Sequence, residues 1–381
     1  MAPFLEKILF ISLVLIFYAY FIYPISIFII SNIRRRYISS NKYIPYVTII
    51  ITAYNEEKRI KKKMENTLEI SYPKEKLQII IASDGSTDET VKMIENYKEK
   101  GVELLVLAER KGKENAQKES LKIAKGDVIV FTDVATMLDP NGIMQIVSNF
   151  ADPTIGCVSS EDRLIGKDGK QSGENLYVRY EMWLRRLESK ANSPVGLSGS
   201  FFAARKIVCQ NFSKDIDSDF ITLLNCVKMG LRGTCDPRAI GYYLDLSDQR
   251  LEFERKVRTI LRGLTTFFRN TDFLNIFKYG LFSYQYFCHK LLRWLIPFFL
   301  MIIFLTNGFL AITSMFYLFI FFGQIFIYVL FLLSIKFDYY SSSWSILKIP
   351  IYFMNVNASI IVAWWRYLRG QRVVMWTPSE R

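Results

Sequence analysis

Acidic and basic side chains follow four predicted strands in the middle of the chain, at the points where the strands end. The segment 52–57, Thr-Ala-Tyr-Asn-Glu-Glu, follows the first strand, and 83–88, Ser-Asp-Gly-Ser-Thr-Asp, follows the second. The basic loop 110–113 follows the third strand, and Asp133 follows the fourth. Ligands bind beyond the carboxyl ends of strands in an open α/β sheet, so we expect these groups to converge on one edge. Carboxylates there can accept hydrogen bonds from a ribose or a base, a lysine can meet a diphosphate, and an aspartate can bind a divalent cation that bridges the diphosphate.

Alternating strand-like and helix-like segments must position these side chains. The apolar, strand-like runs are 47–53, 77–83, 102–107 and 128–132. Polar, helix-like segments separate them, among them 56–69 and 114–125. Ser86 and Glu89 have the spacing of a capping box, which predicts a helix from there to about residue 99. This alternation predicts a mainly parallel sheet with helices on both faces.

The composition excludes several classes of active site. His289 is the only histidine, so neither a Ser-His-Asp system nor a histidine zinc site can be built. The five cysteines form no Cys-x-x-Cys pair, which argues against a structural zinc and favours a reducing compartment. Acid–base chemistry therefore falls to carboxylates, and any metal is held by oxygen.

Long apolar segments flank this region. Residues 8–31 contain no charged side chain and are long enough to span a bilayer, and Arg34, Arg35 and Arg36 follow, which predicts a cytoplasmic location for that end. Further spanning candidates are 295–314, 315–335 and 349–365, and the mixed segment 272–289 is typical of an interfacial helix. We expect four crossings, although the arginines at 366, 369 and 372 favour the inside. The alternative is that 349–365 is re-entrant or interfacial.

The net charge of +13 indicates a phosphate-bearing partner: nucleic acid, anionic lipid or a nucleotide-linked substrate. Many of the basic residues cluster at membrane edges, 34–36 and 366–372, or in one late helix, 255–262. No helix-turn-helix or base-stacking pattern accompanies them. We therefore expect no nucleic acid partner, and we expect contact with membrane lipids.

Seven motifs in order resemble those of the family 2 glycosyltransferases, which have the GT-A fold, and in particular its membrane-bound, synthase-like branch related to hyaluronan, chitin and poly-N-acetylglucosamine synthases. The matching pieces lie within about 47–263 and are Ala53-Tyr54-Asn55-Glu56, Asp84-Gly85-Ser86-Thr87-Asp88, Lys111-Gly112-Lys113, Phe131-Thr132-Asp133, Gly196-Leu197-Ser198-Gly199-Ser200, Ser218-Asp219-Phe220 and Arg255-Lys256-Val257-Arg258.

The resemblance implies a role for each matched residue. The nucleoside of a nucleotide sugar, with a UDP-sugar expected, would be held by Ala53, Tyr54, Glu56 and Asp84. Lys113 would approach the diphosphate, and Asp133 would hold Mg²⁺ or Mn²⁺. Asp219 would be the catalytic base that deprotonates an acceptor hydroxyl for inverting, in-line attack. The acceptor and diphosphate would meet Gly199, Ser200, Arg255 and Arg258.

Two positions depart from the family pattern. The metal-binding Asp-x-Asp motif reads Asp133-Val134-Ala135, so its second carboxylate is missing. The Gln-x-x-Arg-Trp motif of processive members reads Arg-Lys-Val-Arg-Thr at 255–259, so the tryptophan is missing. The first departure puts metal affinity in question, and the second puts processivity in question.

Simpler structural roles compete with these assignments. Asp84 could belong to a turn, Asp133 could solvate a strand end, and Asp219 could lie in a solvated acidic loop with Asp215 and Asp217. The basic helix 255–262 could lie against anionic headgroups. At the level of the whole chain, the alternative to an enzyme is a catalytically inactive GT-A scaffold in a glycan-assembly complex.

The sequence thus predicts an α/β GT-A domain inserted between transmembrane helices. We expect a transmembrane helix over 1–33, a cytoplasmic GT-A domain over 34–272, and an interfacial helix with about three transmembrane segments over 273–381. The expected function is transfer of a sugar from a nucleotide sugar to a glycan or lipid-linked acceptor at the cytoplasmic membrane, in polysaccharide biosynthesis of the cell envelope.

Overall fold

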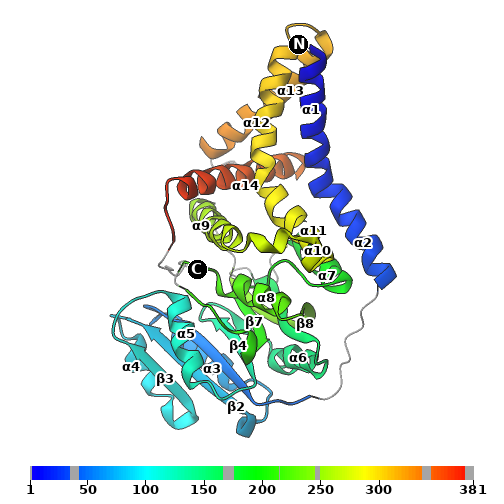
Figure 1. Cartoon of the computed structure of the whole chain (residues 1–381). Helices are drawn as coiled ribbons and strands as arrows, with labels where there is room; N and C mark the ends of the chain where they lie inside the picture. The colour runs from blue at the N-terminus through cyan, green and yellow to red at the C-terminus, as the bar shows by residue number, and fades with distance from the viewer. Residues whose placement is uncertain are drawn as a thin grey trace. The chain divides into compact units, whose positions relative to one another are not determined.

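The computed structural model of the chain describes residues 2–34, 43–165, 176–213, 215–244, 249–336 and 345–373. The chain divides into two compact units (Figure 1). The first unit comprises Met1–Ser26, Asp248–Leu261 and Tyr284–Gln371, and the second comprises Ile27–Ser247, Arg262–Ser283 and Arg372–Arg381. Arg35 and Arg36 of the predicted basic cluster lie outside the described residues.

A mixed sheet forms the centre of the second unit. Its described strands are β1 (Val47–Ala53), β2 (Leu77–Asp84), β3 (Val102–Leu107), β4 (Val128–Asp133), β5 (Met137–Leu138), β6 (Ile155–Ile165), β7 (Phe201–Arg205) and β8 (Arg232–Leu244), in the order β3-β2-β1-β4-β7-β6-β8-β5. β1 pairs in parallel with β2 and β4, and β2 pairs in parallel with β3. β7 is antiparallel to both β4 and β6. The four predicted strand runs are therefore confirmed as β1 to β4.

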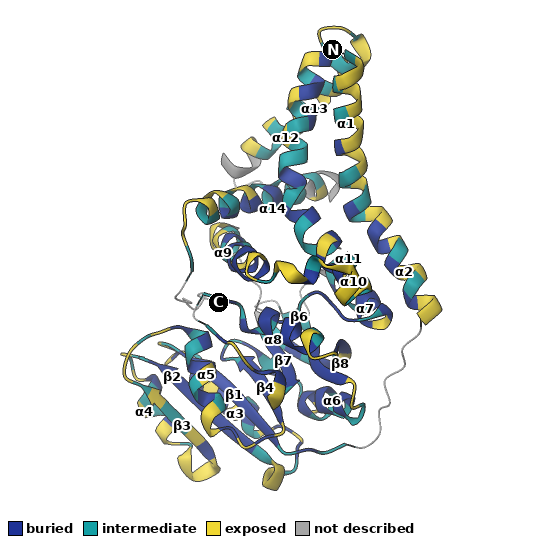
Figure 2. Cartoon of the chain, viewed as in Figure 1, coloured by how far each residue is buried: buried dark blue, intermediate teal, exposed yellow. Residues whose placement is uncertain are grey.

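Helices cover the sheet of the second unit. They are α3 (Ile60–Leu68), α4 (Thr90–Glu95), α5 (Lys113–Ile123), α6 (Gly142–Ser148), α7 (Leu176–Ala191) and α8 (Ser218–Lys228). The same unit contains the short helix α10 (Ile276–Tyr279) and 3₁₀ turns at Lys74–Lys76, Lys98–Lys100, Asn149–Ala151, Lys206–Val208 and Thr271–Leu274. Every residue of β1 is buried, as Figure 2 shows for the inner strands. Strands covered on both faces carry continuous apolar runs, which explains why these strands lack polar alternation.

The predicted capping box at Ser86 and Glu89 is wrong. The Ser86 hydroxyl instead accepts hydrogen bonds from the backbone N–H of Asn55 at 3.2 Å and from the hydroxyl of Ser83 at 2.9 Å. α4 begins later, and the Asp88 carboxylate accepts a hydrogen bond from the Thr90 N–H at 3.0 Å. The Asp88 carboxylate therefore accepts the hydrogen bond at this end of α4, while the Ser86 hydroxyl connects the loops that follow β1 and β2.

The first unit consists of long helices. They are α1 (Ala2–Phe17), which continues through a π-helical turn at Tyr18–Ile22 into α2 (Tyr23–Arg34); α9 (Gln249–Phe268); α11 (Leu281–Tyr286), which continues through a second π-helical turn at Phe287–Leu292 into α12 (Arg293–Leu310); α13 (Met315–Lys336); and α14 (Ser345–Leu368). Three of these helices, α2, α9 and α11, are divided between the two units. Within the described residues, three helical stretches are long and apolar enough to cross a membrane: Ala2–Arg34, Leu281–Leu310 and Met315–Leu333.

The expected crossing at 349–365 is not among these three stretches. It falls in α14, which runs across the axes of α12 and α13 in Figure 1. Its side chains form polar contacts with α9: Arg366 pairs with Glu254 at 3.1 Å, and the Lys256 ammonium lies 4.3 Å from the centre of the Tyr352 ring. The segment expected to be interfacial also differs, because its last part belongs to the stretch Leu281–Leu310.

Candidate active site

The carboxyl ends of β1, β2 and β4 bring three of the expected residues to one edge of the sheet. Ala53 ends β1, Asp84 ends β2 and Asp133 ends β4. Lys113 is the first residue of α5, which follows β3. The parallel pairing of these strands is what places residues from four separate parts of the sequence together.

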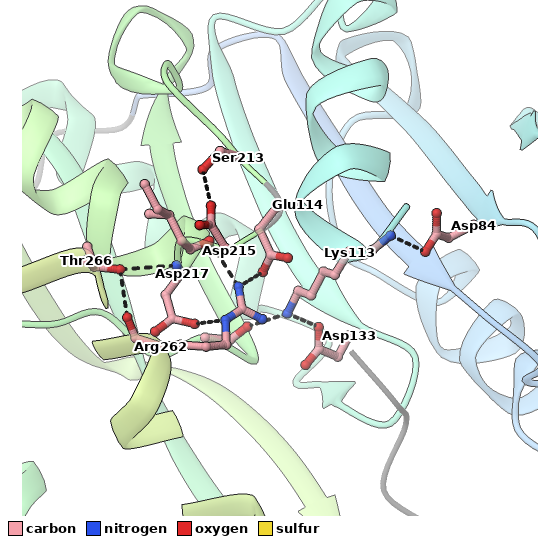
Figure 3. Close-up of polar contacts among 12 residues, drawn as sticks. Asp84, Lys113, Glu114, Asp133, Ser213, Asp215, Asp217, Arg262 and Thr266 are labelled. Atoms are coloured by element: carbon pink, nitrogen blue, oxygen red, sulfur yellow. Dashed lines mark hydrogen bonds and ion pairs between the residues drawn. The ribbon is translucent and has the colours of Figure 1, made fainter. Parts of the chain in front are cut away.

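Asp84 holds the basic loop in place. Its carboxylate oxygens accept hydrogen bonds from the backbone N–H groups of Lys111 at 2.9 Å and Gly112 at 2.8 Å, and the side chain is buried (Figure 3). In the same loop, the guanidinium of Arg110 stacks over the Tyr54 ring at 3.6 Å from its centre. Both carboxylate oxygens of Asp84, the residue expected to contact a nucleoside, thus help to position the loop that carries Lys113.

Glu56 is a second buried carboxylate at this edge. Its Oε2 accepts a hydrogen bond from Arg59 Nε at 2.7 Å, and its Oε1 has no hydrogen-bond partner among the described residues. Burial raises the pKa of Glu56, and the Arg59 charge partly opposes this rise. A buried acceptor oxygen without a donor is costly to the folded chain, and a ligand donor would satisfy it.

Lys113 and Asp133 form an ion pair at the centre of the site. Lys113 Nζ donates to Asp133 Oδ1 at 2.5 Å and to the carbonyl oxygen of Gly199 at 3.0 Å (Figure 3). The two side chains are only 10% and 19% exposed. Burial alone would lower the pKa of Lys113, but the adjacent Asp133 carboxylate outweighs it and the pKa is raised.

A second lysine lies close to this pair. Lys63 of α3 is fully buried, and its Nζ donates to the Thr136 carbonyl oxygen at 2.5 Å and to Thr132 Oγ1 at 3.2 Å. Burial lowers its pKa to about 7, although the nearby Asp133 charge opposes the shift. Our sequence interpretation missed Lys63. Its helical spacing with Ile60, Met64 and Thr67, which are all buried, is the signal that could have identified it.

Asp219, the expected base, lies in the first turn of α8, beside Gly199. A methyl group placed on the Gly199 Cα would be 3.5 Å from the Asp219 carboxyl carbon. Burial, followed by the Asp217 charge, raises the pKa of Asp219 to about 6, while Lys113 and Arg262 act in the opposite direction. The carboxyl is therefore mostly ionised near neutral pH and remains basic enough to accept a proton.

Arg262 is the centre of a buried ionic network that the sequence interpretation did not assign to the site. Its guanidinium pairs with Asp217 through Nε at 2.7 Å, pairs with Glu114, and donates to the Ile216 carbonyl oxygen at 3.0 Å (Figure 3). Glu114 adjoins Lys113, and Asp217 lies two residues before Asp219. Arg262 thus connects the helix on the donor side to the helix that carries the expected base.

Asp162 of β6 was also missed. Its carboxylate accepts a hydrogen bond from the Ser198 hydroxyl, whose oxygen lies 2.7 Å from both carboxylate oxygens, and one from the Ser200 hydroxyl at 2.7 Å. The loop held in this way includes Gly199, and the Ser200 carbonyl oxygen accepts a hydrogen bond from the Asp133 N–H at 3.1 Å. Asp162 therefore fixes the loop that touches Lys113, Asp133 and Asp219.

Residues 48–211 match the model of the family described as Glycosyl transferase family 2. The chain carries a family 2 glycosyltransferase domain. Poly-β-1,6-N-acetyl-D-glucosamine synthases are among its relatives: the protein from Staphylococcus aureus is 28% identical over 213 residues, covering 55% of this chain and 48% of that protein. The protein from Staphylococcus epidermidis is 24% identical over 224 residues, covering 57% and 50%. The chain thus spans about half the length of the curated relatives it matches.

A solved structure shares the fold of the chain over nearly its whole length. It is the mannosyltransferase PcManGT from Pyrobaculum calidifontis in complex with GDP-Man and Mn²⁺, with a TM-score of 0.74 and 21% identity, covering 96% of this chain and 99% of that one. The mixed sheet with its covering helices is therefore the GT-A fold, flanked by apolar helices near the N-terminus and in the C-terminal region.

Two expected residues of the glycosyltransferase, Arg255 and Arg258, belong to the first unit, whereas the other expected residues belong to the second. Arg255 donates through Nε to the Glu252 carboxylate at 2.7 Å on the same helix.

Within the described part of the chain, no three His, Cys, Asp or Glu side chains gather as a ready metal site. A single carboxylate still fits a cation that keeps water ligands and shares the oxygens of a bound diphosphate, and Asp133 is the candidate.

Proposed function

We propose that the chain is a membrane-bound inverting glycosyltransferase that moves a sugar from a nucleotide sugar to a glycan or lipid-linked acceptor. The observation that carries the proposal is the position of Gly199. Its carbonyl oxygen meets the Lys113 ammonium, and its Cα faces the Asp219 carboxylate. A cation suited to a leaving diphosphate and a base suited to an acceptor hydroxyl thus flank one glycine.

The reaction follows from these groups. Asp219 takes the proton of the acceptor hydroxyl, whose oxygen forms a bond to the anomeric carbon from the face opposite the diphosphate. The bond between that carbon and the diphosphate oxygen breaks, and the electron pair leaves with the nucleoside diphosphate. Lys113 stabilises the charge that develops there. When bound at Asp133, Mg²⁺ or Mn²⁺ would supply further neutralisation of the diphosphate.

The nucleoside end of the donor fits the other side of the edge. The unsatisfied Oε1 of Glu56 supports a hydrogen bond from a ribose hydroxyl or a base N–H. The Tyr54 ring with its stacked Arg110 supports contact with the plane of a base. The relatives' names make UDP-N-acetylglucosamine and GDP-mannose the first donors to try.

We also propose a topology with three crossings. The N-terminal stretch ends inside, the stretches Leu281–Leu310 and Met315–Leu333 cross outward and back, and α14 lies along the inner surface. This arrangement places Arg366, Arg369 and Arg372 in the cytoplasm, in agreement with the positive-inside rule. The catalytic domain is then cytoplasmic, where nucleotide sugars are made available.

The test is release of nucleoside diphosphate by detergent-purified protein given a panel of nucleotide sugars, Mn²⁺ or Mg²⁺, and a lipid extract. We expect release from one donor, enhanced by the extract. Asp219→Asn should abolish transfer and retain nucleotide binding. The matched control is Asp215→Asn in the same acidic run, because Asp215 pairs with the exposed Arg269 and should leave transfer intact. Full transfer by Asp219→Asn would overturn the base assignment, and no release from any donor would favour a scaffold.

A further inference from the structure

The carboxylate expected to bind a metal is already neutralised by a lysine. Lys113 Nζ lies 2.5 Å from Asp133 Oδ1, and Ala135 stands where the family pattern has a second carboxylate. Lys113 is anchored on its other side by the Gly199 carbonyl oxygen at 3.0 Å. The free chain therefore offers a cation one carboxylate with an ammonium group in place.

We propose that Lys113 is a built-in counter-ion of Asp133 that excludes a divalent cation until a nucleoside diphosphate binds. The proposal rests on the proposed function, because it assumes a nucleotide-sugar donor. Its consequence is that metal and nucleotide bind cooperatively and that neither Mg²⁺ nor Mn²⁺ binds well to the free protein.

The physical argument is one of competition for an oxygen. A divalent cation approaches a carboxylate oxygen to about 2.1 Å, so it must either displace Lys113 from Oδ1 or bind Oδ2 with an ammonium charge held on the same carboxylate, which opposes it. A single carboxylate binds such a cation too weakly to compensate for the loss of the ion pair between Lys113 and Asp133.

A diphosphate changes this balance in two ways. Its oxygens supply the metal ligands that Ala135 cannot, and they give the displaced ammonium group of Lys113 a new anionic partner. The lysine chain is long and flexible, so it can exchange one oxygen for another without a change of backbone. Since coupling between two ligands is reciprocal, metal should tighten nucleotide binding by the same factor as nucleotide tightens metal binding.

The test is the binding of Mn²⁺ to the full-length protein in detergent, read from the electron paramagnetic resonance signal of free Mn²⁺, without nucleotide and with UDP or GDP. For the wild type we expect weak binding alone and at least tenfold tighter binding with one of the two nucleotides. Lys113→Gln should bind Mn²⁺ alone at least tenfold more tightly than the wild type, with most of the coupling lost. Asp133→Asn should lose the site in both conditions.

Lys111→Gln is the matched control. Lys111 is two residues away in the same loop, and its ammonium pairs with Glu109 at 3.1 Å on the surface. It should reproduce the wild-type Mn²⁺ curves. Thermal melts of all variants check folding, and Lys113→Gln compared with wild type tests the proposal even if neither nucleotide binds.

Unchanged Mn²⁺ affinity in Lys113→Gln, or tight Mn²⁺ binding to the nucleotide-free wild type, would overturn the proposal. The proposed function fails separately. Intact coupling without transfer from any donor would refute the function alone, whereas transfer with unaltered Mn²⁺ binding in Lys113→Gln would refute the counter-ion alone.

Discussion

Replacing Asp217 by asparagine should move the pH dependence of the proposed transfer in a defined direction. Asp217 is the nearest like charge that raises the pKa of Asp219 to about 6, after the larger effect of burial. The same carboxylate pairs with Arg262 Nε at 2.7 Å. Asparagine keeps the shape, removes the like charge and leaves Arg262 with less of its charge neutralised. Both effects lower the pKa of Asp219.

The size of the shift follows from the surroundings. An adjacent opposite charge lowers a carboxyl pKa by ~1–3 units, and we take a like charge that is not neutralised to act in the opposite direction by a similar amount. Arg262 already neutralises part of the Asp217 charge, so the low end applies and we expect a fall of about one unit, equivalent to ~1.4 kcal/mol. The base must be ionised to act, so activity is lost as the pH falls through its pKa. The acid limb should therefore move from about pH 6 to roughly pH 5.

The assay is kcat/KM for nucleoside diphosphate release as a function of pH, because this ratio reports groups of the free enzyme. Asp215→Asn is the control, since Asp215 pairs with Arg269 and is not among the charges that shift Asp219. Loss of the ion pair with Arg262 can lower activity at every pH, so the position of the limb is what counts. A limb that stays in place, moves upward, or moves equally in Asp215→Asn would refute the reasoning.

Other substitutions test the frame of the site. Gly85→Ala should destabilise the fold at least twice as much as Gly101→Ala in thermal unfolding: both glycines have positive φ, which costs roughly 1–2 kcal/mol for alanine, but a methyl at Gly85 would lie 2.7 Å from a backbone nitrogen while Gly101 faces open space. Equal losses would contradict this. Gly199→Ala should fold normally, because its methyl makes ordinary contact with Asp219, yet kcat/KM should fall roughly tenfold or more because the acceptor loses that space. Asp162→Asn has one acceptor oxygen where the carboxylate uses both oxygens to accept from two serine hydroxyls, so kcat should fall about tenfold with nucleotide affinity unchanged; a matching loss of nucleotide affinity would show that the loop it holds also shapes the donor site.

Local sequence determined the parallel part of the sheet, β1 to β4, and the residues at its edge. Four apolar runs separated by helix-like segments specify β1 to β4, because buried parallel strands require continuous apolar residues. Once the strands are parallel, the positions of Asp84 and Asp133 at their carboxyl ends follow without further information. The apolar stretches near the N-terminus and after residue 281 were equally predictable, because spanning a bilayer needs only length and hydropathy.

Tertiary structure decided which charges are paired. Arg262 and Glu114 are 148 residues apart, and Asp162 lies 36 residues from Ser198. No local pattern connects these partners, because the fold and not the sequence distance sets their separation. Burial makes the pairing obligatory, since an unpaired buried charge costs several kcal/mol.

The same distinction applies to two expectations from the sequence. Asp84 has the residue type to contact a nucleoside, and the structure adds that its two oxygens each accept a hydrogen bond from the backbone of the loop 110–113. The segment 349–365 is apolar enough to suggest a crossing. In the structure it makes polar contacts with α9 and is not among the three stretches that are long and apolar enough to cross a membrane. Sequence by itself determined which groups could do chemistry and which segments could enter a membrane. Only the tertiary structure decided which hydrogen bonds and ion pairs those groups form, because these interactions join residues that the fold brings within reach of one another.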